Sequence, residues 1–279
     1  MAQLFLKTYS AILSKGKPYY IERKTAKGIV CTFLTAVSKR KKKELLQKRT
    51  QKNKDELSIL LDDPRHFEIE KSLKRELEHH ITEWIMYSHD GPYNYKVIDS
   101  VFRLAGTGSV GLKRYAFLLK SVNTKDKYLL VDMKQSRASS LAPYVTIPQP
   151  HWESEAARVV AVQQRMQNIP PALLSYSIFK DEPYLIQEMQ PEKDSINFNL
   201  IKERYRDIYQ VIDDMAILTA SSQLRSSGRQ GASVADELIA YGENMQWQEV
   251  VLKYAVKYAQ TLQQNYKQYV SDYKKGDFS

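Results

Sequence analysis

The chain has 279 residues, of which 43% are hydrophobic and 27% charged, and its formal net charge is +10. This length and composition exclude an intrinsically disordered chain and are typical of a folded protein that is long enough for two lobes. No stretch approaches the roughly 18 consecutive apolar residues that cross a bilayer, so we expect no transmembrane segment.

Residues 1–94 are predicted to form a basic, mainly helical N-terminal region. Apolar residues with helical spacing predict helices over residues 1–14 and 29–50, joined by a segment with glycine and proline. Apolar side chains at every fourth position predict a third helix from Glu68 to Ser88. Cys31 is the sole cysteine and excludes an intramolecular disulfide, and the first residues make a poor signal peptide, so we expect a cytoplasmic location.

The excess of positive charge is confined to this N-terminal region. Residues 1–54 hold 15 lysines and arginines against two glutamates, a net charge of +13, whereas residues 55–279 carry a net charge of −3. The lysines and arginines between residues 39 and 54 would attract a phosphate backbone or an anionic lipid, so this segment is a candidate site for an anionic partner. No aromatic residues lie among these charges to stack on bases, and a solvated helix end is the competing interpretation.

Residues 95–191 are predicted to form a β-rich lobe with one helix. The runs VFRLAG and KRYAFLLKS predict a hairpin, and YLLVDMK predicts a third strand beside it. After a proline-containing loop, a helix is expected from about Glu153 to Asn168. The runs SYSIFK and PYLIQEM then predict two further strands.

Residues 192–279 are predicted to form a helical C-terminal lobe, with helices over roughly 199–223, 233–242 and 246–274. The last helix carries an aromatic stripe on one face, which we expect to pack against the rest of the domain. The stripe consists of Tyr254, Tyr258, Leu262, Tyr266, Tyr269 and Tyr273.

The sequence GTGSVG, from Gly106 through Gly108 and Ser109 to Gly111, has glycines at the spacing that wraps backbone around a phosphate. A plain structural turn is one interpretation. A Walker-type P-loop is excluded, because Leu112 follows the last glycine and no hydroxyl residue stands at the required place.

A dinucleotide site is a second interpretation of the glycine-rich sequence. Asp132 lies 21 residues after Gly111, close to the place where such a site has its ribose-binding acid. That site also needs a helix directly after the glycines. Over residues 114–120, however, Tyr115, Phe117 and Leu119 alternate with the other side chains, which is closer to the period of a strand than to that of a helix.

The glycine-rich loop of the protein-kinase fold is the interpretation that we favour. In that fold a hairpin loop covers the phosphates of ATP, and a lysine on the third strand pairs with them in the presence of Mg²⁺. Lys134 lies on the predicted third strand, and Glu153 and Glu155 begin the helix that would supply a carboxylate to hold it. The backbone around Glu188 and Met189 would then meet the adenine edge.

Several motifs together resemble a bacterial family of uncharacterised proteins, domain of unknown function number twenty-two fifty-two. In order, they are LAGTGSVGLKRYAFLL, YLLVDMKQS, ARVVAVQQRMQ, YLIQEMQ and YAVKYAQTLQQNYKQY. The resemblance runs from about Val101 to the C-terminus and is weaker in the basic N-terminal part. It implies an α+β fold like that of protein kinases and aminoglycoside phosphotransferases with permuted parts, in which a small antiparallel β-sheet lobe accompanies a larger helical lobe.

The chain departs from the family's pattern at the motifs that resemble a catalytic base and a metal site. The family's G-D-x-H-x-x-N and N-D-F-D-E motifs are missing from residues 1–100, so the chain resembles the family's later portion without its N-terminal catalytic segment. We therefore expect no catalytic residue and no metal ligand, and a kinase-like protein that binds ATP but is incomplete for catalysis. A separate chain would carry the missing segment. The alternative is a non-enzymatic interaction protein with a structural glycine hairpin and a basic segment for an anionic partner.

Overall fold

The computed structural model describes residues 1–53, 56–61, 65–106, 108, 110–124, 127–190, 196–201 and 203–277. The chain divides into two compact units, of which one is Phe33–Ile196 and the other combines Met1–Thr32 with Asn197–Ser279. The predicted mixed α+β class is confirmed. The unit with the large sheet is the longer of the two, however, which differs from the expected small sheet lobe and larger helical lobe.

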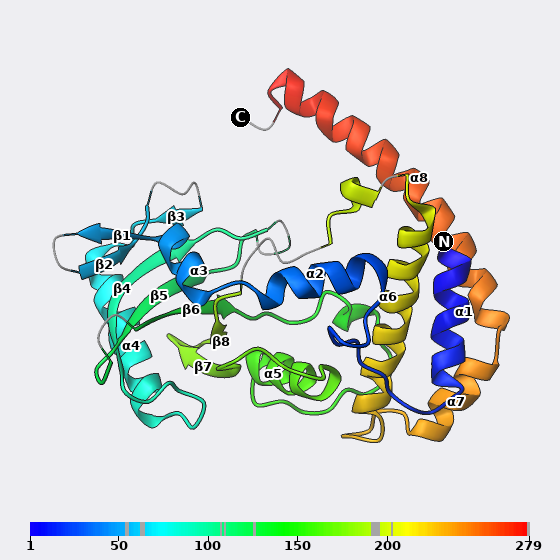
Figure 1. The fold of residues 1–279 in the computed structure, drawn as a ribbon, viewed down its shortest axis with the longest axis horizontal. Helices are drawn as coiled ribbons and strands as arrows, with labels where there is room; N and C mark the ends of the chain where they lie inside the picture. Colours follow the sequence, from blue (N-terminus) through cyan, green and yellow to red (C-terminus); the bar gives the residue numbers. More distant parts are fainter. Residues whose placement is uncertain are drawn as a thin grey trace. The chain divides into compact units, whose positions relative to one another are not determined.

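A six-stranded antiparallel sheet forms the centre of the Phe33–Ile196 unit (Figure 1). Its order is β3-β4-β5-β6-β8-β7, so consecutive strands pair from β3 to β6 and β8 is inserted beside β6. The strands are β3 (His66–Phe67), β4 (Tyr95–Arg103), β5 (Arg114–Ser121), β6 (Tyr128–Gln135), β7 (Ser175–Phe179) and β8 (Glu182–Glu188). The predicted hairpin, third strand and two later strands are confirmed. Since a strand follows the glycines, the dinucleotide-site interpretation is excluded.

Helix α4 (Lys71–Tyr87) covers one face of this sheet. Its spacing of apolar residues places Leu77, Ile81 and Trp84 on the side that packs against Phe117 and Met133 of the sheet. The indole N–H of Trp84 is also buried and donates a hydrogen bond of 3.0 Å to a serine hydroxyl of β7. The helix predicted over this part of the sequence is confirmed.

The opposite face of the sheet is covered by two helices and a small hairpin. Helix α3 (Lys42–Arg49) packs Leu45 and Leu46 onto it, next to the hairpin of β1 (Thr50–Asn53) and β2 (Glu56–Ile59). Helix α5 (Glu155–Met166) packs beside β8 through Val160.

The single helix predicted over residues 29–50 is divided into α2 (Gly28–Ser38) and α3, and the structure adds β1, β2 and β3 to the predicted strands. Short 3-10 turns occur at Ala142–Tyr144 and Phe198–Ile201.

The other unit is built mainly from α1 (Ala2–Leu13), α6 (Tyr205–Ser226), α7 (Ala235–Glu243) and α8 (Gln246–Lys275). Helix α1 packs against α6, where Ile12 and Leu13 meet Ala220 and Leu224. No helix in the described part of the chain is both long and apolar enough to cross a membrane.

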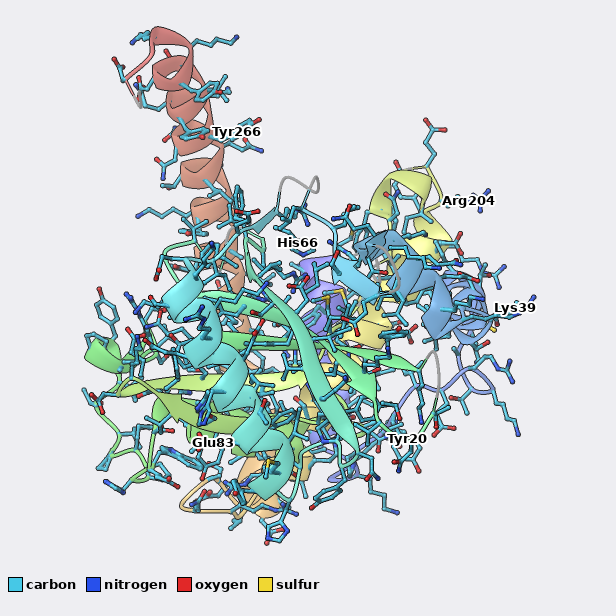
Figure 2. The ribbon with its side chains drawn as sticks, turned by 90° about the vertical axis from the view of Figure 1, so that its left-hand side faces the viewer. Tyr20, Lys39, His66, Glu83, Arg204 and Tyr266 are labelled. Carbon is cyan, nitrogen blue, oxygen red and sulfur yellow. The ribbon has the colours of Figure 1, made fainter. Side chains whose placement is uncertain are left out.

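The predicted packing of the aromatic stripe on α8 is wrong. Its six members are between 53% and 67% exposed. Tyr266 illustrates this, since its side chain projects from the helix in Figure 2. The helical period correctly predicted one uncharged, aromatic face, but a period does not specify which surface covers that face.

Gly242 lies where α7 packs against α1. A Cβ atom at this position would lie 2.7 Å from Cβ of Leu13 and 2.9 Å from the carbonyl oxygen of Ser10. Alanine favours a helix over glycine by about 1 kcal/mol, but overpacking costs about 1–3 kcal/mol. We therefore expect Gly242→Ala to lower the urea midpoint of unfolding. Glu243→Ala, at an exposed position of the same helix, should leave that midpoint nearly unchanged, and equal midpoints for the two variants would contradict this packing.

Candidate functional site

The glycine-rich segment is the loop that connects β4 to β5. Gly111 has φ of +79°, a left-handed conformation that favours glycine. Gly106 and Gly108 have no such φ, and a Cβ atom at either would meet no described atom within 4 Å apart from its neighbours in the chain. Neither local backbone strain nor packing in the described structure therefore requires glycine at these two positions. Ser109 lies outside the described residues.

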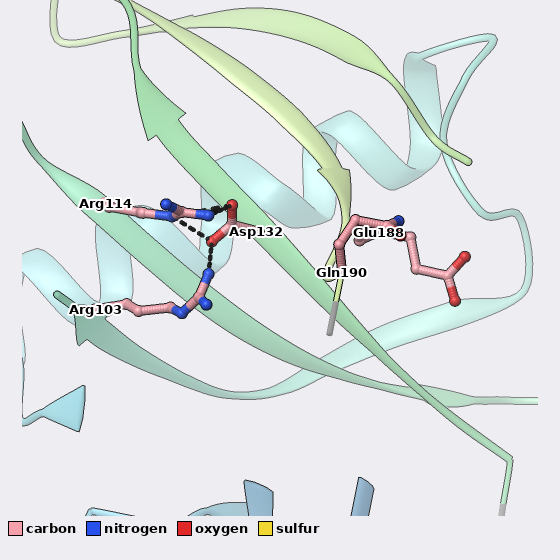
Figure 3. A network of polar contacts seen from close by, with 5 residues as sticks. All are labelled: Arg103, Arg114, Asp132, Glu188 and Gln190. Carbon is pink, nitrogen blue, oxygen red and sulfur yellow. Dashed lines mark hydrogen bonds and ion pairs between the residues drawn. The ribbon is translucent and has the colours of Figure 1, made fainter. Parts of the chain in front are cut away.

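A buried carboxylate on β6 ties the two ends of this loop together (Figure 3). Asp132, which is 1% exposed, accepts hydrogen bonds from Nη1 of Arg103 at 2.8 Å and from Nη2 of Arg114 at 2.6 Å. Arg103 is the last residue of β4, and Arg114 is the first residue of β5. Because charge-assisted hydrogen bonds away from water are strong, this network fixes the base of the glycine loop.

A second network holds the end of the loop to β6 and β8. The side chain of Gln135 accepts a hydrogen bond from the backbone N–H of Lys113 at 3.1 Å and donates one to Glu182 at 2.9 Å. The Lys113 ammonium also lies 2.7 Å from a Glu182 carboxylate oxygen. That hydrogen bond lowers the pKa of the Glu182 carboxyl below its ordinary value. The carboxylate therefore stays ionised where it supports the loop.

Lys134 lies on β6, directly opposite Arg114 of β5 and Leu185 of β8. Side chains two positions apart on a strand share a face, so Lys134 is on the same face of the sheet as Asp132. Among the described residues, the Lys134 ammonium has no hydrogen-bond or ion-pair partner. Arg114 is paired with Asp132, so Lys134 is the cation on this face that has no partner among the described residues.

The structure does not bring Glu153 or Glu155 into contact with Lys134. Glu155 is the first residue of α5, and its carboxylate accepts a hydrogen bond of 2.7 Å from Nε of Arg158. Glu153 precedes the helix and accepts a hydrogen bond of 2.7 Å from the hydroxyl of Tyr176. Both carboxylates are thus engaged with neighbours of α5 itself.

At the end of β8, several backbone groups form hydrogen bonds with other parts of the protein. The N–H of Glu188 donates to the carbonyl of Ala172 at 2.8 Å, and the N–H of Met189 donates to the carbonyl of Leu130 at 2.9 Å. The side-chain amide of Gln190 donates to the carbonyl of Glu188 at 3.1 Å, and in Figure 3 the Glu188 carboxylate points away from Asp132. An adenine ring at this stretch would therefore need backbone groups other than these N–H donors.

Sequence reasoning missed the two arginines of the site and assigned Asp132 only to the excluded dinucleotide site. One signal was present, because Arg103 lies three residues before the first glycine and Arg114 three residues after the last. Two arginines at equal distances from the ends of a hairpin loop predict that both bind the same anion or carboxylate. The partner itself follows only from the pairing of β5 with β6.

Comparison with known proteins gives a family for this chain. The sequence profile described as "Uncharacterized protein conserved in bacteria (DUF2252)" matches residues 7–272. The match includes most of the N-terminal part and is therefore not restricted to the later portion from Val101 onward. No curated protein and no solved structure gave a match. The chain accordingly belongs to this family of uncharacterised proteins conserved in bacteria.

Proposed function

We propose that the chain is a kinase-like protein that binds ATP between its glycine loop and Lys134. The observation that carries this proposal is the presence of glycine at two positions where the protein's own structure does not need it. At Gly91, by contrast, a Cβ atom would lie 2.7 Å from the carbonyl oxygen of Trp84. At Gly106 and Gly108 the absence of a side chain leaves room for a phosphate to approach the backbone N–H groups.

The order and placement of the elements support the same proposal. A hairpin with the glycine loop is followed by a third strand with Lys134, then by α5, and then by the strand that ends at Glu188. Leu185, directly opposite Lys134, packs with Val160 of α5. The helix thus lies on the face that carries the lysine, as in a kinase nucleotide site.

The electrostatics of the site favour an anionic ligand. Arg114 is occupied by Asp132, whereas Lys134 has no partner among the residues that the structure describes. A lysine ammonium is a common phosphate ligand, and it would contact the phosphates as a point charge. The fixed base of the loop would limit the conformational entropy lost on binding.

Phosphoryl transfer is not part of this proposal for the chain by itself. Transfer needs a residue that orients the nucleophile and carboxylates or amides that hold Mg²⁺, besides a loop and a lysine. Residues 1–100 contain no G-D-x-H-x-x-N motif, and Glu153 and Glu155 are engaged near α5. A separate chain with the catalytic motifs would complete the enzyme.

ATP titrations with and without Mg²⁺, read by calorimetry and thermal unfolding, test the proposal. ATP at 100 times its dissociation constant should stabilise the wild type by about 2.7 kcal/mol. Lys134→Ala should weaken binding at least about tenfold, a loss of about 1.4 kcal/mol. Lys127→Ala is the matched control, because Lys127 is exposed and lies at the opposite end of β6 from Lys134. Equal affinity of wild type and Lys134→Ala would contradict the assignment of Lys134.

The second candidate function is a non-enzymatic interaction protein that binds an anionic partner through the basic segment. Lys41 and Lys43 are exposed, while Leu45 and Leu46 hold α3 on the sheet. A fixed helix therefore presents these lysines to solvent. Salt-sensitive binding to heparin that is lost in Lys41→Ala/Lys43→Ala, together with no response to ATP, would favour this candidate.

A further inference from the structure

The exposed aromatic face of α8 begins beyond the point where this helix is anchored. At the anchored end, the Gln248 amide donates to the hydroxyl of Ser10 at 2.8 Å, and Trp247 stacks on Tyr241 with ring centroids 4.9 Å apart. From Tyr254 to Tyr273 the aromatic side chains are more than half exposed. Tyrosines are enriched in protein interfaces, and a contiguous exposed patch of this kind marks an interaction surface.

The charged residues of α8 lie away from this aromatic face. At 3.6 residues per turn, six of the seven charged residues lie more than about 100° around the helix axis from Leu262. These six are Glu249, Lys253, Lys257, Lys267, Lys274 and Lys275. Asp272 is the seventh and lies at the edge of the stripe. Apart from Asp272 at its edge, the face therefore carries no charge and suits an uncharged, aromatic surface.

The centre of the stripe is symmetrical around Leu262, because Tyr258 lies four residues before it and Tyr266 four residues after it. The three outer tyrosines have apolar residues at their mirror positions, Val270 for Tyr254, Ala255 for Tyr269 and Val251 for Tyr273. In a two-fold interface each residue meets a partner that it contacts in return. Two antiparallel α8 helices that cross at Leu262 would therefore place Tyr258 of each copy opposite Tyr266 of the other. A parallel arrangement would not use this symmetry.

The exposed area of the stripe approaches the area that a standard dimer interface buries on each partner. Fully buried aromatic side chains contribute about 150–250 Å² each, so five tyrosines that are 53–67% exposed offer on the order of 600 Å² together. Leu262 and the flanking alanines add to this. Standard interfaces bury about 800 Å² per partner.

From these observations we infer that the chain forms a homodimer by antiparallel pairing of α8 across its aromatic stripe, with the two-fold axis at Leu262. The two copies bury tyrosines against each other and leave the lysines of α8 in solvent. This inference is independent of nucleotide binding, because the residues of the stripe lie in a different unit from the glycine loop.

Sedimentation velocity of the full chain over a concentration series tests the dimer. The wild type should sediment as a dimer, and Leu262→Lys should sediment as a monomer because it places two like charges at the axis. Gln260→Lys adds the same charge on the opposite side of the helix and should remain dimeric. Circular dichroism checks that each variant is folded.

A charge-exchange pair tests the antiparallel register itself. Tyr258→Lys alone should give a monomer, and Tyr258→Lys combined with Tyr266→Glu should restore the dimer, since each new lysine would face a glutamate of the other copy. A wild type that is monomeric at every concentration, or a dimer that persists in Leu262→Lys, would overturn the inference. A monomer that binds anionic lipid vesicles through α8 would overturn it as well and assign the face to a membrane surface.

Discussion

Asp132→Ala is expected to destabilise the chain by about 3–5 kcal/mol, the typical cost of removing one partner of a buried ion pair. The substitution would leave Arg103 buried and Arg114 largely buried beside an apolar side chain. The loss should appear as a lower urea midpoint of the unfolding transition, measured by circular dichroism. The ends of the glycine loop would also lose their common anchor, so ATP binding should weaken in the same variant.

Lys113→Ala is the control for the effect of Asp132→Ala. Lys113 forms an ion pair with Glu182 at the same end of the loop, but its side chain is 51% exposed. Exposed ion pairs contribute about 0–1 kcal/mol, so this variant should unfold close to the wild type. If Asp132→Ala lowered the urea midpoint of unfolding no more than Lys113→Ala does, the buried network would not stabilise the fold as described.

Gly106→Ala/Gly108→Ala should change stability and ligand binding in opposite directions. Both positions have room for a Cβ atom and no positive φ, so alanine should stabilise the fold by restricting the unfolded chain, about 0.4–1 kcal/mol per site. The added methyl groups would occupy the space that a phosphate needs near the backbone. We expect ATP affinity to fall at least about tenfold while the unfolding midpoint rises.

Gly111→Ala distinguishes a glycine that the backbone conformation requires from the two glycines proposed to make room for a phosphate. Its φ of +79° disfavours any residue with a side chain, so alanine should destabilise the fold by about 1 kcal/mol or more. Urea unfolding and ATP calorimetry on both variants give the comparison. The assignment of the loop as a phosphate site would fail if Gly106→Ala/Gly108→Ala bound ATP as the wild type does.

The elements that the sequence predicted correctly are those with a clear local pattern. Helix α4 repeats apolar residues every fourth position, and β5 is a short continuous apolar run from Tyr115 to Leu119 that the polar turn after it bounds, so the local sequence indicates each element. Strands β1 and β3 have four and two residues, which is too short for a period to be recognised. The break between α2 and α3 falls in a run of basic residues that carries no helix-stop signal.

The candidate site was predictable only in part, because its central contacts are far apart in the sequence. The glycines and Lys134 follow a recognisable spacing. The contact of Asp132 with Arg103 depends on how β4, β5 and β6 pair, and no local pattern encodes that register. In the same way, the order of the elements in the chain suggested that the carboxylate of Glu153 or Glu155 pairs with Lys134. In the structure, Tyr176 donates a hydrogen bond to Glu153 instead, and Arg158 donates one to Glu155.

Nucleotide binding is best tested by a calorimetric titration of the purified wild-type chain with ATP and Mg²⁺. We expect saturable binding of one nucleotide per chain, accompanied by a higher unfolding temperature. The same titration with adenosine should give much weaker binding, because the proposed contacts of the loop and Lys134 are made to phosphate. The absence of any binding heat and of any thermal shift at millimolar ATP would rule out the proposed nucleotide site, and the glycines would then form only a structural hairpin.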